Sequence, residues 1–300
     1  MMRIGCQTYS WQMSLPLYQG RVDHICEVVG RAGFAGLEAE VIMLGQFAGA
    51  ERLRGTLEAN RLELAALTLV EDWAGEHETP QERASADAAI ALAASFDGAL
   101  LALCQMPGRD RHDLAERQRR VLSCVRDVAR RAEAAGLRTT FHPNSPEGSL
   151  FRTAEDYEIL LDGLPAAVGF TPDLGHVARG GMGPLAVVKQ YRERVNHVHA
   201  KDMDGDGRWA LIGTGVVPVA EVAQFLHGTG YEGWFVLEDE SELAERDPDG
   251  VAAQLGQYVD KVLRPLCEEA QCEGARCEQG WYDGEHFEKE EHYEKGGPNG

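Results

Sequence analysis

The 300-residue sequence lacks the features that mark several protein classes. No apolar run reaches the ~18 residues that a membrane-spanning helix needs. Basic residues are few, with 29 Lys and Arg against 49 Asp and Glu, which gives a net charge of −20. A chain that binds the phosphate backbone needs clustered Lys and Arg, and an anionic membrane surface repels such acidity. We therefore expect neither nucleic acid nor a membrane as a partner.

Three further features are missing. The seven cysteines are odd in number and spread along the chain, unlike a disulfide framework. The N-terminal stretch, residues 1–6, enters a strand-like run without the layout of a signal peptide, so we expect a cytoplasmic protein. The segment that follows this run, residues 5–9, is not a Gly-rich phosphate loop, which an open doubly wound sheet usually carries there.

What the sequence does contain is a regular alternation of strand-like and helix-like segments, with 44% hydrophobic residues to build a core. We expect strands at 3–8, 34–38, 64–69, 99–103, 138–141, 167–171, 195–200 and 234–238. We expect helices at 23–31, 51–60, 80–94, 114–135, 153–161, 184–191, 219–228 and 249–263. Because crossover helices produce parallel strands, eight such units predict a (β/α)₈ TIM barrel over residues 1–265. An open doubly wound sheet is the alternative.

The last part of the chain, residues 266–300, differs in composition. It is rich in Glu, poor in aliphatic residues, and ends in Gly-Gly-Pro-Asn-Gly. We predict an acidic, disordered tail. Its Cys267, Cys272 and Cys277 recur every five residues, which matches no zinc-binding spacing.

Four imidazole or carboxylate side chains stand where expected strands end: His142, Asp173, His199 and Glu238. In a barrel the carboxyl ends of the strands meet at one mouth, so these side chains are predicted to converge. His199 is preferred to His197 because it lies nearer the mouth on the same strand. Mixed nitrogen and oxygen donors without a thiolate suit Mn²⁺, Zn²⁺, Co²⁺ or Fe²⁺. We predict a divalent-metal site, with Mn²⁺ as the expected ion.

Short motifs accompany these residues in chain order: Gly36-Leu37-Glu38, Phe141-His142-Pro143-Asn144, Pro172-Asp173-Leu174-Gly175-His176, His197-Val198-His199-Ala200-Lys201-Asp202, Gly213-Thr214-Gly215-Val216-Val217 and Gly230-Tyr231-Glu232-Gly233-Trp234-Phe235-Val236-Leu237-Glu238. As a set, they resemble the xylose-isomerase-like sugar isomerase/epimerase superfamily of TIM barrels. The resemblance covers residues 3–265. Within the superfamily the likeness is greatest to inosose dehydratase-type members, which share the His-Pro pair, the His-x-His-x-Lys-Asp run and an acidic Asp-Pro segment.

The resemblance implies a divalent metal held by Asp173, His199, Glu238 and the residue at position 142. In the epimerase branch that position is Glu, whereas here it is His142. Epimerases of this type use two carboxylates on opposite faces of the substrate carbon. The imidazole at position 142 leaves Glu238 as the only carboxylate of that pair. A less neutralised cation also polarises a bound carbonyl more strongly.

The activity expected from these residues is metal-dependent isomerisation or epimerisation of a small keto-sugar or polyol. A base removes the proton α to the ketone and produces a metal-stabilised enediolate. Candidate bases are Glu238, His142 and Glu38, in that order. Lys201 is a candidate for placing a cation on a hydroxyl or a leaving group, with a surface lysine as the alternative.

Three residues are candidates for substrate binding. His176 matches a substrate-contacting histidine of the superfamily. Trp11 and Trp73 fall in loops at the expected mouth, where they would either stack on a sugar ring or only pack.

Other functions stay open at this stage. A lyase on the same scaffold, either inosose dehydratase-like or cleaving a keto-glycoside by β-elimination, is the main alternative, and His142 favours it. An abasic-site endonuclease is disfavoured by the net charge and the small number of ligands. A non-catalytic sugar-binding protein would leave the carboxylates without a purpose. The substrate, recognition of a phosphate and assembly into a homo-oligomer are not determined by the sequence.

Overall fold

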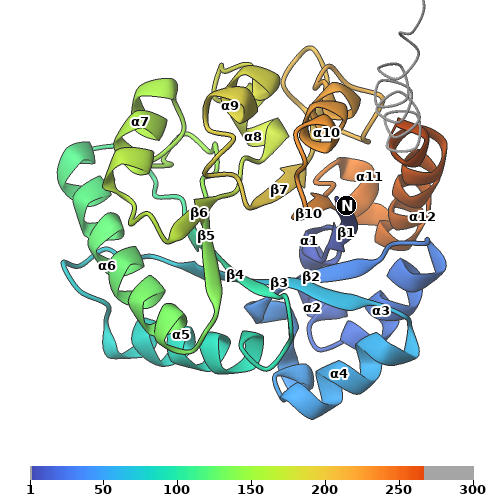
Figure 1. Cartoon of the computed structure of the whole chain (residues 1–300), viewed down its shortest axis with the longest axis horizontal. Coiled ribbons are helices and arrows are strands. Elements are labelled where there is room, and N and C mark those ends of the chain that lie inside the picture. The colour runs from blue at the N-terminus through green and yellow to red at the C-terminus, as the bar shows by residue number, and fades with distance from the viewer. Residues whose placement is uncertain (1, 267–300) are drawn as a thin grey trace, which may run out of the picture.

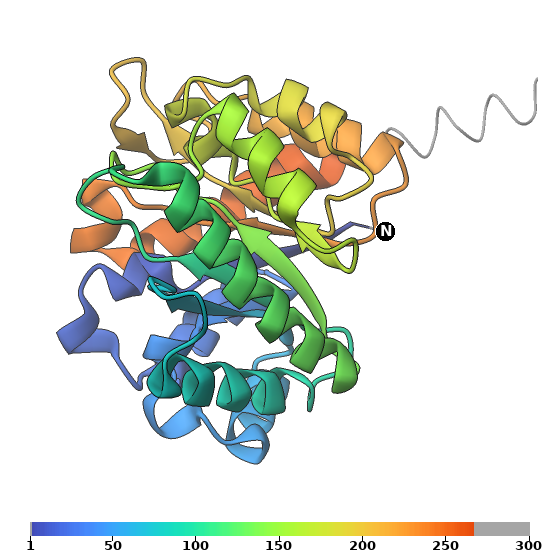
Figure 2. The ribbon, with the colours of Figure 1, turned by 90° about the vertical axis from the view of Figure 1, so that its left-hand side faces the viewer.

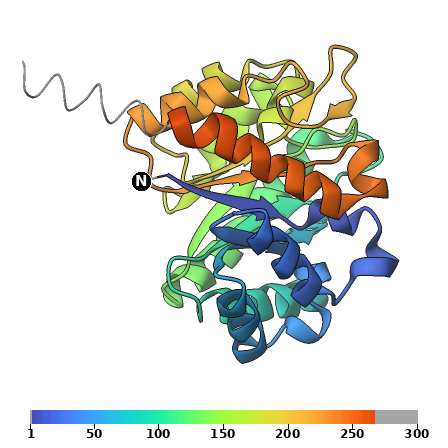
Figure 3. The same cartoon turned by 90° about the vertical axis from the view of Figure 1, so that its right-hand side faces the viewer.

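A computed structural model describes residues 2–266. Eight parallel strands surround a central axis, and the helices lie outside them (Figure 1; Figures 2 and 3 give the two side views). The strands of this sheet are β1 (Arg3–Gln7), β2 (Gly36–Glu40), β3 (Glu63–Glu71), β4 (Leu100–Gln105), β5 (Arg138–His142), β6 (Val168–Phe170), β7 (His197–Ala200) and β10 (Trp234–Leu237). A short antiparallel hairpin, β8 (Asp202–Met203) and β9 (Trp209–Ala210), follows β7.

The strand order is β6-β5-β4-β3-β2-β1-β10-β7, so the sheet must close between β6 and β7. Two isolated parallel bridges join this seam, Phe170 with Val195 and Asp173 with His199. At the second bridge the His199 N–H donates to the Pro172 carbonyl over 3.1 Å. The barrel predicted from the sequence is confirmed, and two of the predicted metal ligands lie where it closes.

The eight predicted helices are found in the predicted order, and residues 2–266 contain four further short helices that were not predicted. The helices are α1 (Tyr9–Gln12), α2 (Leu15–Tyr18), α3 (Val22–Arg31), α4 (Ala50–Ala59), α5 (Pro80–Ala93), α6 (Leu114–Ala134), α7 (Ala154–Gly163), α8 (Leu174–Arg179), α9 (Pro184–Gln190), α10 (Val219–Gly228), α11 (Glu242–Arg246) and α12 (Pro248–Tyr258), with the 3₁₀ turns η1 (Val41–Met43) and η2 (Gly45–Phe47) and the π turn η3 (Val259–Leu263). Within residues 2–266, none of them combines the length and apolarity that a membrane span requires. The predicted acidic tail lies outside the described residues.

Helix α6 shows how the local sequence sets the outer layer. Val121, Leu122, Val125 and Val128 recur at helical spacing and are all buried against the sheet, while Arg and Glu side chains occupy the other face. The helix ends before Gly136, whose φ of 73° is a left-handed conformation that glycine adopts without strain.

The close contact between Gly36 of β2 and the Trp234 ring of β10 gives a stability prediction. A Cβ at Gly36 would overlap the indole ring of Trp234, which is 1% exposed. Gly36→Ala is expected to lower the free energy of unfolding by about 2 kcal/mol because the packed ring cannot move away. Urea unfolding measures this loss, and Gly55→Ala is the control. Gly55 lies inside α4 with open space around it, so alanine there should raise the stability by about 0.5–1 kcal/mol. Equal effects of the two substitutions would contradict the packing argument.

Candidate active site

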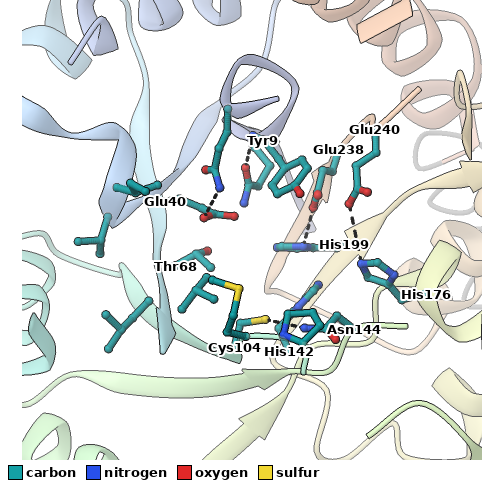
Figure 4. A pocket seen from close by; sticks show the side chains of 18 of the residues that line it. Tyr9, Glu40, Thr68, Cys104, His142, Asn144, His176, His199, Glu238 and Glu240 are labelled. Carbon is teal, nitrogen blue, oxygen red and sulfur yellow. Dashed lines mark hydrogen bonds and ion pairs between the residues drawn. The ribbon is translucent and has the colours of Figure 1, made fainter. Parts of the chain in front are cut away.

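A cavity of about 400 Å³ opens at the carboxyl ends of the strands. Figure 4 shows side chains that line it. The polar wall carries His142, His176, His199, Glu238 and Glu240, whereas the apolar wall comes from the last part of β3 and from residues that follow β2, β4 and β5. The apolar side chains are Val41, Ile42, Leu69, Val70, Met106, Pro107 and Pro146. The cavity is where the architecture of a TIM barrel places an active site.

Asp173 is positioned by the end of β6. Pro172 has no N–H to continue the ladder, and Asp173 then becomes the N-cap of α8. Its Oδ1 accepts a hydrogen bond from the His176 N–H over 2.8 Å. Its Oδ2 lies 3.6 Å from His142 Nε2 and 3.9 Å from His199 Nδ1, with hydrogen-bond geometry to neither. One carboxylate oxygen thus holds the helix while the other faces the polar wall.

His199 is held between two carboxylates. Its Nε2 lies 2.9 Å from both oxygens of Glu38, and its Nδ1 lies 3.0 Å from Glu238 Oε2. Burial opposes a charge on this ring, but Glu38 and Glu238 outweigh it and raise the pKa of His199 to about 10. Glu38 fixes the orientation of the ring and leaves Nδ1 directed toward Glu238 and Asp173 (Figure 4 shows the Glu238 side).

Glu38 was predicted as a candidate base, and the structure places it one layer below the cavity. It is 0% exposed and does not line the cavity. Its carboxylate is bound by His197 Nε2 at 2.5 Å, by His199, and by the Thr68 hydroxyl at 2.5 Å. Burial works against the charge, but the two imidazoles hold the pKa of Glu38 well below its usual range. This arrangement supports the barrel interior and the orientation of His199 rather than contact with a substrate.

Lys201 is a buried cation and not a surface lysine, since it is 1% exposed. Its Nζ lies 3.2 Å from Asp173 Oδ2 and 2.8 Å from Glu238 Oε1, and it also pairs with Glu240. Burial opposes its charge, but these three carboxylates keep the pKa of Lys201 well above its ordinary value. The lysine therefore neutralises the acidic side of the cavity.

His176 faces the same lysine from α8. Its Nε2 lies 3.3 Å from Lys201 Nζ, and its Nδ1 lies 2.7 Å from the Ser145 hydroxyl. Burial, together with the Lys201 ammonium, lowers the pKa of His176 to about 3, so the ring is neutral. Both ring nitrogens already have a partner, so a ligand hydroxyl would bind this neutral imidazole by replacing the longer contact, the one with Lys201.

Three overlapping groups of side chains have ligand atoms within 4.8 Å of one another. They are Glu38 with His197 and His199, Asp173 with His199 and Glu238, and His142 with Asp173 and His176. The first group is closed by its own hydrogen bonds. The other two share Asp173. In them His142 Nε2 is shielded from solvent without a hydrogen-bond partner, whereas Asp173 Oδ2 and His199 Nδ1 are shielded and form only ion-pair contacts, with Lys201 and Glu238 respectively. Buried polar atoms are rarely left so, and these three belong to the four predicted ligands.

The two tryptophans singled out in the sequence do not lie on the cavity. Trp11 is 0% exposed, and its Nε1 donates to Asp249 Oδ1 over 2.7 Å. Trp73 is also 0% exposed. Both side chains pack inside the protein, so neither is placed to stack on a ligand in the cavity.

Several cavity residues escaped the sequence reasoning. Glu40 and Glu240 line the cavity, as do Tyr9 and Gln12 of α1. Trp209, from the β8–β9 hairpin, stands edge-on to His176 with ring centroids 5.2 Å apart. Strand periodicity could have identified Glu40, because it follows Glu38 by two residues and therefore lies on the same side of β2.

Comparison with known proteins agrees with this architecture. Residues 26–261 match the family model described as "Xylose isomerase-like TIM barrel". The chain belongs to this family. TIM-barrel enzymes have their active sites at the carboxyl ends of the strands, and the four predicted ligands lie at such strand ends.

Individual members of the xylose isomerase-like family show where the likeness lies. An inosose dehydratase of Bacillus anthracis is 29% identical over 149 residues, which is 43% of this chain and 49% of that protein. The chain thus spans about half the length of the curated relatives it matches. The probable 3-DHS dehydratase AsbF from Bacillus anthracis has a TM-score of 0.70 at 14% identity, covering 87% of this chain and 99% of that one. The IolI protein, solved with a binding zinc atom, has a TM-score of 0.68 at 14% identity, covering 90% and 99%. At this identity the two structures show the fold alone.

Proposed function

We propose that this chain is a metal-dependent enzyme that enolises a small keto-sugar or keto-polyol and then eliminates a β-hydroxyl as water. The observation that carries the proposal is the cluster of buried ligand atoms His142 Nε2, Asp173 Oδ2 and His199 Nδ1 beside the Glu238 carboxylate. They occupy the mouth of a barrel whose family includes dehydratases.

The residues fit a divalent cation. Two imidazole nitrogens and two carboxylates form a donor set without thiolate, which suits Mn²⁺, Zn²⁺, Co²⁺ or Fe²⁺, and a zinc atom accompanies the IolI protein of the same fold. Asp173, His199 and Glu238 would hold the ion together with His142. When bound, the ion would act as a Lewis acid that polarises the ketone and an adjacent hydroxyl. Because His199 is protonated without the ion, binding would release a proton from its ring.

The remaining roles fall to the side chains themselves. Glu238 stays ionised because Lys201 and His199 outweigh its burial and lower its pKa to about 2, so it can accept the α-proton only from a strongly acidified carbon. His142, at the end of β5, is the second candidate base. Neutral His176 is placed to hold a substrate hydroxyl, and Lys201 keeps the charge of the carboxylates balanced during the reaction.

Dehydration is preferred to isomerisation for two reasons. The sequence relative named above is an inosose dehydratase. Position 142 also carries an imidazole, where the epimerase branch places a second carboxylate for two-faced proton transfer.

A second candidate, β-elimination from a keto-glycoside, is favoured by the apolar wall. Ile42 and Met106 are 47% and 48% exposed there, and both border the cavity. An apolar substituent on the sugar would remove this surface from water, whereas a free polyol would leave it wet.

Proton exchange in D₂O tests the proposal. The protein with Mn²⁺ is expected to exchange the α-proton of a keto-inositol and to produce an absorbing enone, because the ketone is enolised and water is then lost. Nuclear magnetic resonance follows the exchange, and ultraviolet absorption follows the enone. A panel of ketoses and of keto-glycosides with a phenyl substituent separates the alternatives. Exchange without loss of water would indicate an isomerase, and release of phenol would indicate the glycoside lyase.

Addition of Mn²⁺ alone gives a readout that needs no substrate. If the ion binds this group with micromolar affinity, millimolar Mn²⁺ should stabilise the fold by about 4 kcal/mol, which raises the melting temperature by several degrees. Differential scanning calorimetry measures the shift, and Mg²⁺, which prefers oxygen ligands, should produce a smaller one. An unchanged melting temperature with every divalent ion would contradict the metal site.

A further inference from the structure

The Glu40 carboxyl group is an exception among the acidic groups of the cavity. Glu238 and Glu240 both pair with Lys201. Glu40 is 7% exposed, and in the described part of the chain no Lys, Arg or His lies within ion-pair distance of it. A buried carboxylate without a cation is costly, so a group of this kind in a cavity points to a chemical role.

Two amides hold Glu40 in place of a cation. The Gln12 Nε2 donates to Glu40 Oε2 over 2.8 Å, and Gln7 borders the same part of the cavity. The backbone N–H of Glu40 donates to the Thr8 hydroxyl over 3.1 Å. Gln12 Oε1, on the same amide, is shielded from solvent and accepts no hydrogen bond within residues 2–266. A hydroxyl group of a ligand is the kind of donor that Gln12 lacks.

The position of Glu40 relative to the proposed metal ligands follows from the strand order. Glu40 ends β2, and β2 lies four strands from β6 in either direction round the barrel. It is therefore diametrically opposite Asp173, which follows β6. Figure 4 shows Glu40 across the cavity from His176 and Glu240. Glu40 and the proposed ligands line one cavity at the mouth of the barrel, so a substrate bound to the ligand group would reach Glu40 with its far side.

We infer that Glu40 is the proton donor to the leaving hydroxyl group, facing the substrate from the wall opposite the proposed metal ligands. This inference rests on the proposed function. The base takes the α-proton, the electron pair forms the new carbon–carbon double bond, and the β carbon–oxygen bond breaks. The departing oxygen takes the proton of the Glu40 carboxyl and leaves as water. Glu40 is left as a carboxylate and regains its proton from solvent at the open mouth.

The protonation of Glu40 agrees with this role. Burial, together with the negative charges of Glu238 and Glu38, raises its pKa to about 7, although the Gln12 amide favours the charged form. A group with this pKa is protonated in part of the molecules near neutral pH and can both donate and regain a proton.

Glu40→Gln separates the two halves of the reaction. With Mn²⁺, a keto-inositol and D₂O, this variant is expected to exchange the α-proton within about 3-fold of the natural protein, because the base is intact. Enone formation should fall at least about 100-fold, since the leaving oxygen receives no proton. An analogue with fluoride in place of the leaving hydroxyl needs no proton, so its elimination should be nearly unaffected. Glu71→Gln is the matched control. It removes a half-buried carboxylate at the end of neighbouring β3, outside the cavity, and should change neither rate.

Each outcome bears on the inference. Enone formation at the natural rate in Glu40→Gln would overturn it, as would an equal loss of exchange and elimination or an equal loss with hydroxyl and fluoride. If the glutamine variant does not fold, Glu40→Ala with added formate replaces it, and restored enone formation is the supporting result. Failure of formate to restore it in a folded alanine variant would overturn the inference. Absence of both exchange and enone in the natural protein would instead refute the proposed function and the inference with it.

Discussion

Asp173→Asn is expected to lower kcat/KM by at least about 1000-fold while leaving the fold in place. The asparagine retains Oδ1, which caps α8 by accepting the His176 N–H. It replaces Oδ2, which lies 3.2 Å from Lys201 Nζ, with an amide nitrogen, which cannot bind a cation. The substitution thus removes one donor and preserves the N-cap. Steady-state rates with a keto-inositol and calorimetric titration with Mn²⁺ measure the two effects, and both should be lost together.

Asp156→Asn is the matched control for this variant. Asp156 is 3% exposed, completes the capping box of α7 and pairs with Arg111, so it is a buried helix-capping aspartate outside the cavity. Because Asp156 accepts hydrogen bonds from Arg111 and Gln118, its replacement should cost about 1–3 kcal/mol of stability and leave the rate per folded molecule unchanged. Full activity in Asp173→Asn, or equal losses in the two variants, would contradict the role of Asp173 in the cavity.

Glu38→Gln is expected to affect stability and the site together. Glu38 accepts contacts from both His197 and His199, and all three side chains are buried. Removal of the central charge leaves two buried imidazoles without their partner, a class of change that costs about 3–5 kcal/mol. Urea unfolding measures this loss. Glu63→Gln is the control, because Glu63 pairs with Arg3 at the surface and should change the stability by less than about 1 kcal/mol.

The same substitution reaches the proposed metal through His199. A glutamine amide would present an N–H toward one imidazole, which favours the tautomer that carries its proton on Nδ1. Since Nδ1 is the atom that faces Asp173 and Glu238, Mn²⁺ affinity should fall about 10- to 100-fold. Calorimetric titration of folded Glu38→Gln tests this. Unchanged affinity together with lowered stability would limit Glu38 to a structural role.

The barrel was predictable from the sequence because its signals are local and repeated. Helix α6 carries four valine and leucine residues at helical spacing, and each strand-like run is short and apolar. Strand ends were harder to predict. The sequence placed the second strand at 34–38, whereas β2 runs from Gly36 to Glu40. Glu38 marks a polar end in the sequence, but it lies inside the barrel because His197 and His199 face it from β7. That partnership spans about 160 residues and is invisible to local pattern.

Contacts that a local pattern does not reveal also explain why the sequence misplaced the two tryptophans and missed α8. The sequence placed Trp11 in a loop at the expected mouth. Its indole N–H instead donates to Asp249, which lies far along the chain, and the side chain is buried. The helix α8 was missed because Gly175 reads as a loop residue, while the cap supplied by Asp173 starts a helix there. The convergence of His142, Asp173, His199 and Glu238 followed from topology alone, because parallel strands must end at one rim. The hydrogen bonds and ion pairs of these side chains depend on Glu38, on Lys201 and on the role of Asp173 as the N-cap of α8. The sequence alone reveals none of these contacts.

The seam between β6 and β7 has a consequence for protein engineering. Apart from the bridge of Phe170 with Val195, the two edges meet at Asp173 and His199, which are also members of the candidate metal group. Substitutions that change the candidate metal ligands at these two positions therefore also affect the seam between β6 and β7, which is joined by only two isolated bridges within residues 2–266. A redesign for another ion would need compensating reinforcement elsewhere along this seam, for instance longer pairing below Val195, before the new ligands are introduced.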